Sequence, residues 1–129
     1  MKRDMELVRK IMLEVEKADD VIYNLKIDNY TADLVSYHCH MLDECRLING
    51  YSAYYSNDEL EEFSVGQLTW DGHDFLEKIR DDSLWGKTKD VIKKKGLPLI
   101  IDTIKTVSTA FIAAAAEGVA NSILKNGTP

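Results

Sequence analysis

The sequence predicts an α+β fold, namely a winged-helix-like domain with a small antiparallel sheet, plus a long C-terminal helix. Two segments carry this prediction. Residues 37–48 read YHCHMLDECRLI, which indicates a helix running into a strand. Residues 68–82 read LTWDGHDFLEKIRDD, which indicates a strand that ends at Thr69 and turns at once into a helix capped by that threonine. A polar hairpin lies between them, and this order is typical of the back half of a winged-helix domain.

The first elements follow from apolar periodicity. Helical spacing of apolar residues over 4–17 predicts a helix, with Asp4 accepting from its first amides. Residues 21–27 alternate as a short strand does. Thr31 then begins a helix that reaches Cys45. The expected inner faces are Val21, Tyr23, Leu25 and Ile27 for the strand, and Leu34, His38, Met41, Leu42 and Cys45 for the second helix.

The hairpin and the later helices are placed in the same way. Residues 47–55 and 63–68 are the expected strands, and the acidic segment 56–62 is the expected tip. After Thr69, the inner helix face is predicted to be Gly72, Phe75, Leu76 and Ile79. A glycine inside a helix costs about 1 kcal/mol relative to alanine, so Gly72 predicts a close packing contact.

A further helix is expected over 83–95, with Trp85, Thr88, Val91 and Ile92 inward. Gly96 is the predicted C-cap, and Pro98 is expected to start a last helix that reaches about Lys125. We therefore expect two parts, a winged-helix-like domain at residues 1–82 and a helical C-terminal extension at residues 83–129.

Composition narrows the function classes. With 22 acidic residues against 16 Lys and Arg, the net charge of −6 argues against a protein that coats nucleic acid. Cys39 and Cys45 diverge on a helix and are expected to stay reduced, as in a cytoplasm. The N-terminus has no apolar signal segment. Charges interrupt the apolar stretch 97–124, so no membrane span is expected; they are Asp102, Lys105 and Glu117.

The chain resembles a family known as domain of unknown function 2513, common in phages and prophages. Three segments carry the resemblance: residues 1–16 (MKRDMELVRKIMLEVE), the 37–48 segment, and residues 68–89 (LTWDGHDFLEKIRDDSLWGKTK). It implies a phage or prophage setting and a bacterial cytoplasm, and it supplies no activity, catalytic residue or cofactor. Relatives often have Ala-Gly where this chain has Cys45-Arg46, so the arginine is expected to disfavour a turn with positive φ.

The chain shows no pattern that predicts catalysis or a bound metal. His38 and His40 lie about 200° apart on a helix, and His73 belongs to no motif, so His38 and His73 are expected in core or capping roles. We find no nucleophile elbow, glycine-rich phosphate loop or Cys-His signature. The protein is therefore expected not to be an enzyme, and to need no cofactor.

Two functional surfaces remain open. Tyrosines beside an acidic tip favour protein binding, to a host or phage partner that the sequence does not name; these residues are Tyr51, Tyr54, Tyr55, Asp58, Glu59, Glu61 and Glu62. The alternative is a DNA-binding transcription regulator, which fold analogy suggests and the acidic tip disfavours. It would use Tyr37, His40, Lys87, Lys89, Lys93, Lys94 and Lys95.

The C-terminal helix is expected to mediate self-association, most simply as a homodimer. Its apolar stripe is wide for one contact surface, and its seam has the 3.5-residue spacing of paired helices. The seam residues are Ile101, Ile104, Phe111, Ala115 and Gly118. Two alternatives are that this helix packs wholly against the first helix (residues 4–17) of its own chain, and that it acts on membranes.

Overall fold

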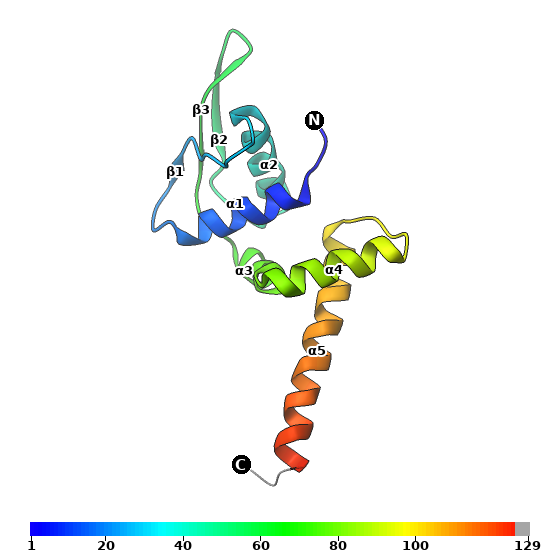
Figure 1. Cartoon of the computed structure of the whole chain (residues 1–129). Helices are drawn as coiled ribbons and strands as arrows, with labels where there is room; N and C mark the ends of the chain where they lie inside the picture. Colours follow the sequence, from blue (N-terminus) through cyan, green and yellow to red (C-terminus); the bar gives the residue numbers. More distant parts are fainter. Residues whose placement is uncertain (126–129) are drawn as a thin grey trace. The chain divides into compact units, whose positions relative to one another are not determined.

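The computed structural model describes residues 1–125. The chain forms two compact units, Met1–Glu77 and Lys78–Pro129. In chain order the elements (Figure 1) are α1 (Met5–Lys17), β1 (Ile22–Tyr23), α2 (Ala32–Glu44), β2 (Ser52–Ser56), β3 (Glu59–Val65), α3 (Trp70–Ile79), α4 (Asp82–Lys94) and α5 (Ile101–Lys125). The expected boundary after residue 82 lies shortly beyond the division between the units, and two independent domains stay a prediction.

The first unit confirms the α+β class. Its three strands form an antiparallel sheet in the order β1-β3-β2, with β3 central. Helix α2 packs against α1 and against β3. One sheet face carries the buried Phe63 and Val65, whereas Tyr23, Tyr54 and Glu62 lie on the other face, exposed to solvent. The small antiparallel sheet and the long C-terminal helix are thus as predicted, and winged-helix topology stays a prediction.

Asp4 joins the start of α1 to two other segments. Its carboxylate caps α1 by accepting the amides of Glu6 and Leu7, as predicted, and also accepts the Tyr30 hydroxyl. Its own amide donates to Nε2 of the fully buried His38 at 2.8 Å. Nδ1 of His38 lies 2.8 Å from the Leu34 carbonyl, so Nδ1 carries the proton. The core role predicted for His38 is confirmed; His73 is exposed, so a core role for it is wrong.

Two expected inner faces differ in detail. Strand β1 covers only Ile22–Tyr23, and Val21 and Tyr23 are exposed, although Leu25 and Ile27 beyond the strand are buried. In α2, Cys45 is exposed and Leu34 and Met41 are only partly buried. The observed face follows i, i+3, i+4 and i+7 spacing from Val35, one residue later than expected. It consists of Val35, Ser36, His38, Cys39 and Leu42.

The hairpin is longer and its turn is tighter than expected. The turn is only Asn57 and Asp58, both with positive φ, the geometry of a two-residue type I′ turn that Asn and Asp tolerate. Residues 59–62, predicted to belong to the tip, therefore lie in β3. Strand β2 starts at Ser52 and not at residue 47, and Ile48 and Leu68 form only an isolated bridge.

Helices α2 and α4 end in the same hydrogen-bond pattern. After α4, Gly96 has φ +66° and the amide of Leu97 bonds the carbonyl of Ile92, which confirms the predicted C-cap. After α2, Arg46 has φ +64° and the amide of Leu47 bonds the carbonyl of Leu42. This is a Schellman ending, which usually uses glycine. The expectation that Arg46 avoids positive φ is wrong, since the two hydrogen bonds at the helix end offset a cost of about 1–2 kcal/mol.

Helix α3 forms as the sequence predicts. Thr69 Oγ1 accepts the amide of Gly72 and also donates to the carbonyl of Arg46, so one hydroxyl caps α3 and ties it to the end of α2. Phe75, Leu76 and Ile79 are fully buried. A Cβ at Gly72 would clash with the carbonyl oxygen of Leu47, which confirms the predicted close contact.

In the second unit α4 packs against α5. The predicted inward residues Trp85, Thr88 and Ile92 are buried, and Val91 is partly so. Helix α5 begins at Ile101, three residues later than predicted, because Leu97–Ile100 form the connection that follows the Gly96 ending. At its start, Thr103 Oγ1 accepts the amide of Ile100 and donates to nearby carbonyls. The alternative in which α5 packs wholly against its own chain is wrong, because Ile104 and Ser108 alone are buried along the helix.

Candidate functional site

The β2–β3 hairpin carries six of the seven predicted protein-binding residues, and all six are exposed. Tyr54 pairs with Glu62, and both point to the open face of the sheet. Tyr54 is 64% exposed and Tyr55 is 56% exposed. Tyrosine side chains are enriched at protein interfaces, because the ring is apolar and the hydroxyl can form a hydrogen bond. The hairpin therefore offers two exposed tyrosines beside acidic residues.

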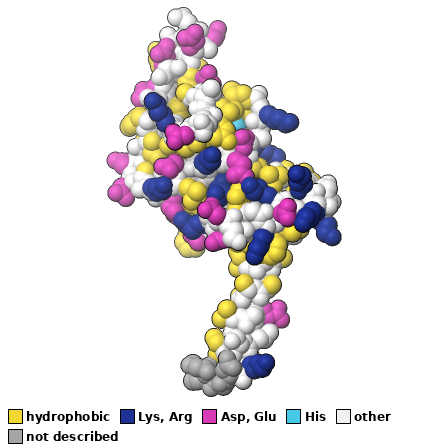
Figure 2. All heavy atoms as spheres, in the orientation of Figure 1, with side chains coloured by type: hydrophobic (Ala, Val, Ile, Leu, Met, Phe, Trp, Pro, Cys, Tyr) yellow, Lys and Arg dark blue, Asp and Glu magenta, His cyan; other side chains and the backbone are white. Residues whose placement is uncertain are grey.

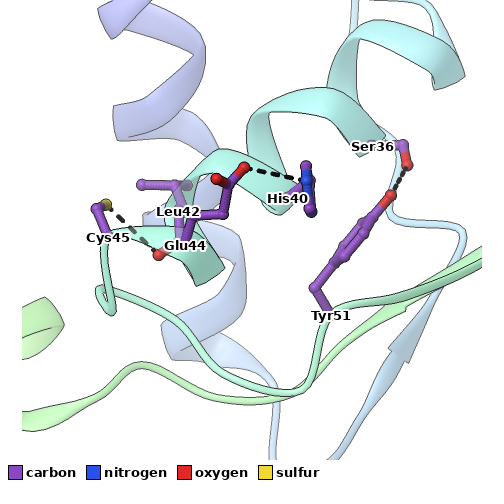
Figure 3. Close-up of polar contacts among 6 residues, drawn as sticks. All are labelled: Ser36, His40, Leu42, Glu44, Cys45 and Tyr51. Carbon is purple, nitrogen blue, oxygen red and sulfur yellow. Dashed lines mark hydrogen bonds and ion pairs between the residues drawn. The ribbon is translucent and has the colours of Figure 1, made fainter.

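Tyr51 has a different role. Its hydroxyl lies 2.8 Å from Ser36 Oγ on α2, and its amide donates to the Asp43 carboxylate at 2.9 Å. Its ring lies beside His40, which contacts Glu44 at 3.0 Å (Figure 3). Burial raises the pKa of the Tyr51 phenol. Tyr51 thus ties the segment before β2 to α2.

A β-bulge divides the hairpin. The register runs from Tyr54 opposite Glu62 to Tyr55 opposite Leu60, so Glu61 is the extra residue on β3. Beyond the bulge Tyr55 pairs with Leu60 on β3. The Tyr55 side chain points to the sheet face opposite that of Tyr54. The seven predicted residues therefore do not form one surface, and Tyr54 and Tyr55 serve different faces of the same hairpin.

The hairpin end is strongly acidic. Asp58, Glu59, Glu61 and Glu62 are all exposed, and Figure 2 shows the Asp and Glu side chains that gather at its tip. No lysine or arginine occurs between Tyr51 and Trp70. The local potential is therefore negative, which favours a cationic partner and opposes phosphate.

A groove lies beside β3, on the side that faces β1 and the chain after it. It has a volume of about 390 Å³. Its apolar lining comes from three segments, namely the chain after β1, the start of α2 and β3. The lining residues are Asn24, Leu25, Lys26, Ile27, Asp28, Tyr30, Ala32, Val35, Leu60, Glu61 and Phe63. The sequence interpretation missed this groove; the apolar Leu60 inside an acidic run was the one signal for it.

Asn24 ends the pairing of β1 with β3. Its amide donates to the Phe63 carbonyl at 2.8 Å, and its side-chain oxygen accepts the Phe63 amide at 3.0 Å. Asn24 has φ +53°, so the chain leaves the sheet there. Within the described residues, no strand pairs with β3 on this side between Glu59 and Glu62. An open strand edge and an apolar groove thus lie next to each other.

The predicted nucleic-acid-binding residues are split between the two units. Tyr37 and His40 belong to α2. The lysines lie on α4 and just after it, where Lys94 contacts Asp90 at 3.2 Å and Lys89 lies over the Trp85 ring. Lys87, Lys93 and Lys95 are exposed. Their arrangement within the second unit is that of a solvated helix face.

The self-association seam divides into two parts along α5. Ile104 and Ser108 are fully buried in their own chain, so Ile104 is unavailable to a second copy. Ile101 and Phe111 are partly exposed, and Ala115 and Gly118 are exposed. Helix α5 is also long and apolar enough to cross a membrane by length and composition. Its exposed large apolar residues are Ile112, Val119, Ile123 and Leu124.

Three of the histidines and cysteines, His38, Cys39 and His40, are consecutive on α2. Among residues 1–125, no three His, Cys, Asp or Glu side chains are grouped so as to hold a metal ion. Cys39 is buried and Cys45 is exposed, and both are free thiols in the structure. Burial raises the pKa of the Cys39 thiol to about 12, which makes it a packing residue and not a nucleophile.

Comparison with known proteins places the chain in a family. The family model described as "Hypothetical protein (DUF2513)" matches residues 2–98, which end before α5. A protein of Haemophilus influenzae named "Uncharacterized protein" is 37% identical over 116 residues, covering 88% of this chain and 97% of that protein. No solved structure matches. The chain therefore belongs to the family described as Hypothetical protein (DUF2513), as the three sequence segments had indicated.

Proposed function

We propose that this protein is a small, non-catalytic accessory protein of phage or prophage type that acts by binding another protein in the bacterial cytoplasm. The observation that carries the proposal is the β2–β3 hairpin, which presents Tyr54 and Tyr55 to solvent beside four exposed acids. Tyrosine is enriched at protein interfaces, and phosphate would be repelled by this charge. The phage setting rests on the sequence resemblance alone.

Tyr54 and Glu62 provide a direct test of the hairpin. The assay captures proteins from nuclease-treated extracts of lysogenic cells on the immobilised wild-type protein. A Tyr54→Ala, Glu62→Lys double variant is expected to retain about tenfold less, or even less, of any partner that the wild type captures. Both side chains are exposed, so the fold should survive. The matched control is Asp19→Lys, which makes the same charge change as Glu62→Lys at an exposed position outside the hairpin and the groove. Equal retention by wild type and double variant, measured by quantitative mass spectrometry, would contradict the proposal.

DNA binding is the alternative, favoured by the lysines on and after α4. We expect little affinity for duplex DNA at physiological salt, because the whole chain carries a net charge of −6. Mobility shifts at two salt concentrations measure this. Tight binding with a steep salt dependence, lost in a Lys93→Glu, Lys94→Glu variant, would establish the regulator function in place of protein binding.

We propose that α5 pairs with α5 of a second copy. Ile104 and Ser108, which are buried within the chain, lie on the same stripe of α5 as Phe111, Ala115 and Gly118, which are not buried. The small residues there allow a second helix backbone to approach closely. At 1.5 Å per residue the helix is about 37 Å long, and α4 covers only its beginning. An apolar helix left in water would be an aggregation liability.

Ala115→Glu is expected to convert the dimer into a monomer, because a buried carboxylate at the seam has no partner. The control is Ala113→Glu, which places the same charge about 200° away around the helix. Both positions are exposed in the single chain, so neither substitution should unfold it. Light scattering at tens of micromolar gives the mass. A monomeric wild-type protein that floats with lipid vesicles would instead support the membrane alternative.

A further inference from the structure

The open side of β3 and the groove beside it resemble the parts of a strand-addition site. Strand β1 stops after Tyr23. The amide of Asn24 donates to the Phe63 carbonyl, and its side-chain oxygen accepts the Phe63 amide, so both backbone groups of Phe63 are hydrogen-bonded. Beyond that point β3 continues to Glu59 with β2 as its one strand neighbour in the described chain. A strand edge of this kind exposes backbone donors and acceptors that another extended chain can pair with.

The groove supplies what the edge alone lacks. An added strand points alternate side chains to the two sheet faces, and pockets for those side chains give selectivity. Here Leu60 and Phe63 line the groove from β3, and the other aliphatic side chains of the lining are Leu25, Ile27, Ala32 and Val35. Its volume of about 390 Å³ is enough for one or two large aliphatic side chains.

The charges select the partner. The exposed Asp58, Glu59, Glu61 and Glu62 surround the edge, and Asp28 lines the groove, with Lys26 the single cation in that lining. A chain lying along β3 would pass these carboxylates on its way to the groove. An extended segment with alternating basic and apolar residues therefore complements both the edge and the groove.

We infer that the outer edge of β3 at Glu59–Glu62 and its adjoining groove bind an extended basic–apolar segment of a partner protein, which adds to the sheet as a strand continuing the line of β1. This inference rests on the proposed protein-binding function and names the site and partner chemistry. The chain leaves the sheet at Asn24, and this exit leaves the Glu59–Glu62 stretch of the edge without a strand neighbour in the described chain. The backbone of β3 and the groove make the contact, and on the open face only the Glu62 carboxylate adds to it, through its charge.

The test uses the full-length, nitrogen-15-labelled protein and defined peptides. The probe is a capped peptide of roughly eight residues with alternating Lys and Val, which spans a typical strand. One comparison peptide replaces every Lys by Glu. A second keeps the charges and carries N-methyl groups on alternate backbone nitrogens, so that it cannot donate along one edge. Affinity is measured by titration calorimetry, and the site is mapped by amide chemical shifts.

The Lys-Val peptide is expected to shift the amides of residues 59–62 and 24–30. The acidic and the N-methylated peptides should each bind about tenfold or more weakly, because loss of charge attraction or of two hydrogen bonds is worth that factor. Glu61→Lys, at an exposed position, should reduce the preference for the Lys peptide over the Glu peptide, because it removes one of the carboxylates around the edge and adds a cation. Leu60→Lys, in the groove wall, should abolish binding, whereas Tyr54→Ala should change affinity less than about twofold.

The outcomes separate the two proposals. If the N-methylated peptide binds as well as its parent, or if no peptide binds at millimolar concentration, strand addition at β3 is overturned. Shifts confined to the Tyr54 face, with affinity lost in Tyr54→Ala and kept in Leu60→Lys, would overturn this inference and leave the hairpin as a protein-binding element. Partner loss in the Tyr54→Ala, Glu62→Lys variant is a separate result that tests the proposed function.

Discussion

Gly72→Ala is expected to lower the free energy of unfolding of the first unit by about 3 kcal/mol or more, which is at the upper end of overpacking costs. A Cβ at this position meets the carbonyl oxygen and carbon of Leu47, both parts of a backbone held by α2 and by Thr69. A flexible side chain could move away, but this backbone cannot move without breaking the bond between the Thr69 amide and the Leu47 carbonyl. The gain in helix propensity of about 1 kcal/mol does not offset that loss.

The matched control for this prediction is Gly86→Ala. Gly86 also lies inside a helix, but no atom lies within 4 Å of a Cβ built there. That substitution should stabilise the second unit by about 1 kcal/mol through helix propensity alone. Urea denaturation monitored by circular dichroism compares both variants with wild type. A Gly72→Ala protein as stable as Gly86→Ala would mean that α3 does not approach Leu47 as closely as described.

Phe75→Ala is expected to cost about 3–5 kcal/mol, the usual range for removing a buried phenylalanine. Phe75 is fully buried on α3, one turn after Gly72. Because Gly72 lets α3 approach the Leu47 backbone closely, the Phe75 ring lies in the core. Removal leaves a cavity that a helix anchored at Thr69 cannot close. The thermal midpoint should fall by tens of degrees for a unit of this size.

Trp70→Ala is the control on the same helix. Trp70 is larger than Phe75 but is 82% exposed, so its removal should change the free energy of unfolding by no more than about 0.5 kcal/mol. Differential scanning calorimetry of the two variants measures the contrast. Similar midpoints for Phe75→Ala and Trp70→Ala would show that the buried face of α3 is misassigned.

These predictions bear on the candidate site because β3 leads directly into α3. Phe63 and Val65 anchor β3 in the core, and the chain reaches Thr69 four residues after Val65. A variant that loosens α3 would therefore also loosen the base of the hairpin. Binding experiments on the hairpin should use substitutions at exposed positions such as Glu61 and Tyr54, which leave this anchor intact.

Local chemistry in the sequence determined much of the fold. The Thr69 cap, the inner face of α3, the Gly96 ending of α4 and the order of helices and hairpin all depend on residues within a few positions of one another, which is why periodicity and capping rules predict them. The same is true of the acidic character of the hairpin. Family membership was also readable from three short segments of sequence.

The tertiary structure alone decided features that depend on contacts between distant segments. Arg46 adopts positive φ because bonds to Leu42 and Thr69 hold both ends of the turn, so a local preference for glycine is overridden. Ile104 belongs to the chain's own core because α4 packs on α5. The groove beside β3 combines residues from 24–35 with residues from 60–63, and pairing to Asn24 determines where the strand edge opens. No local pattern encodes those distances, because the free energy that sets them is gained only when the segments pack together.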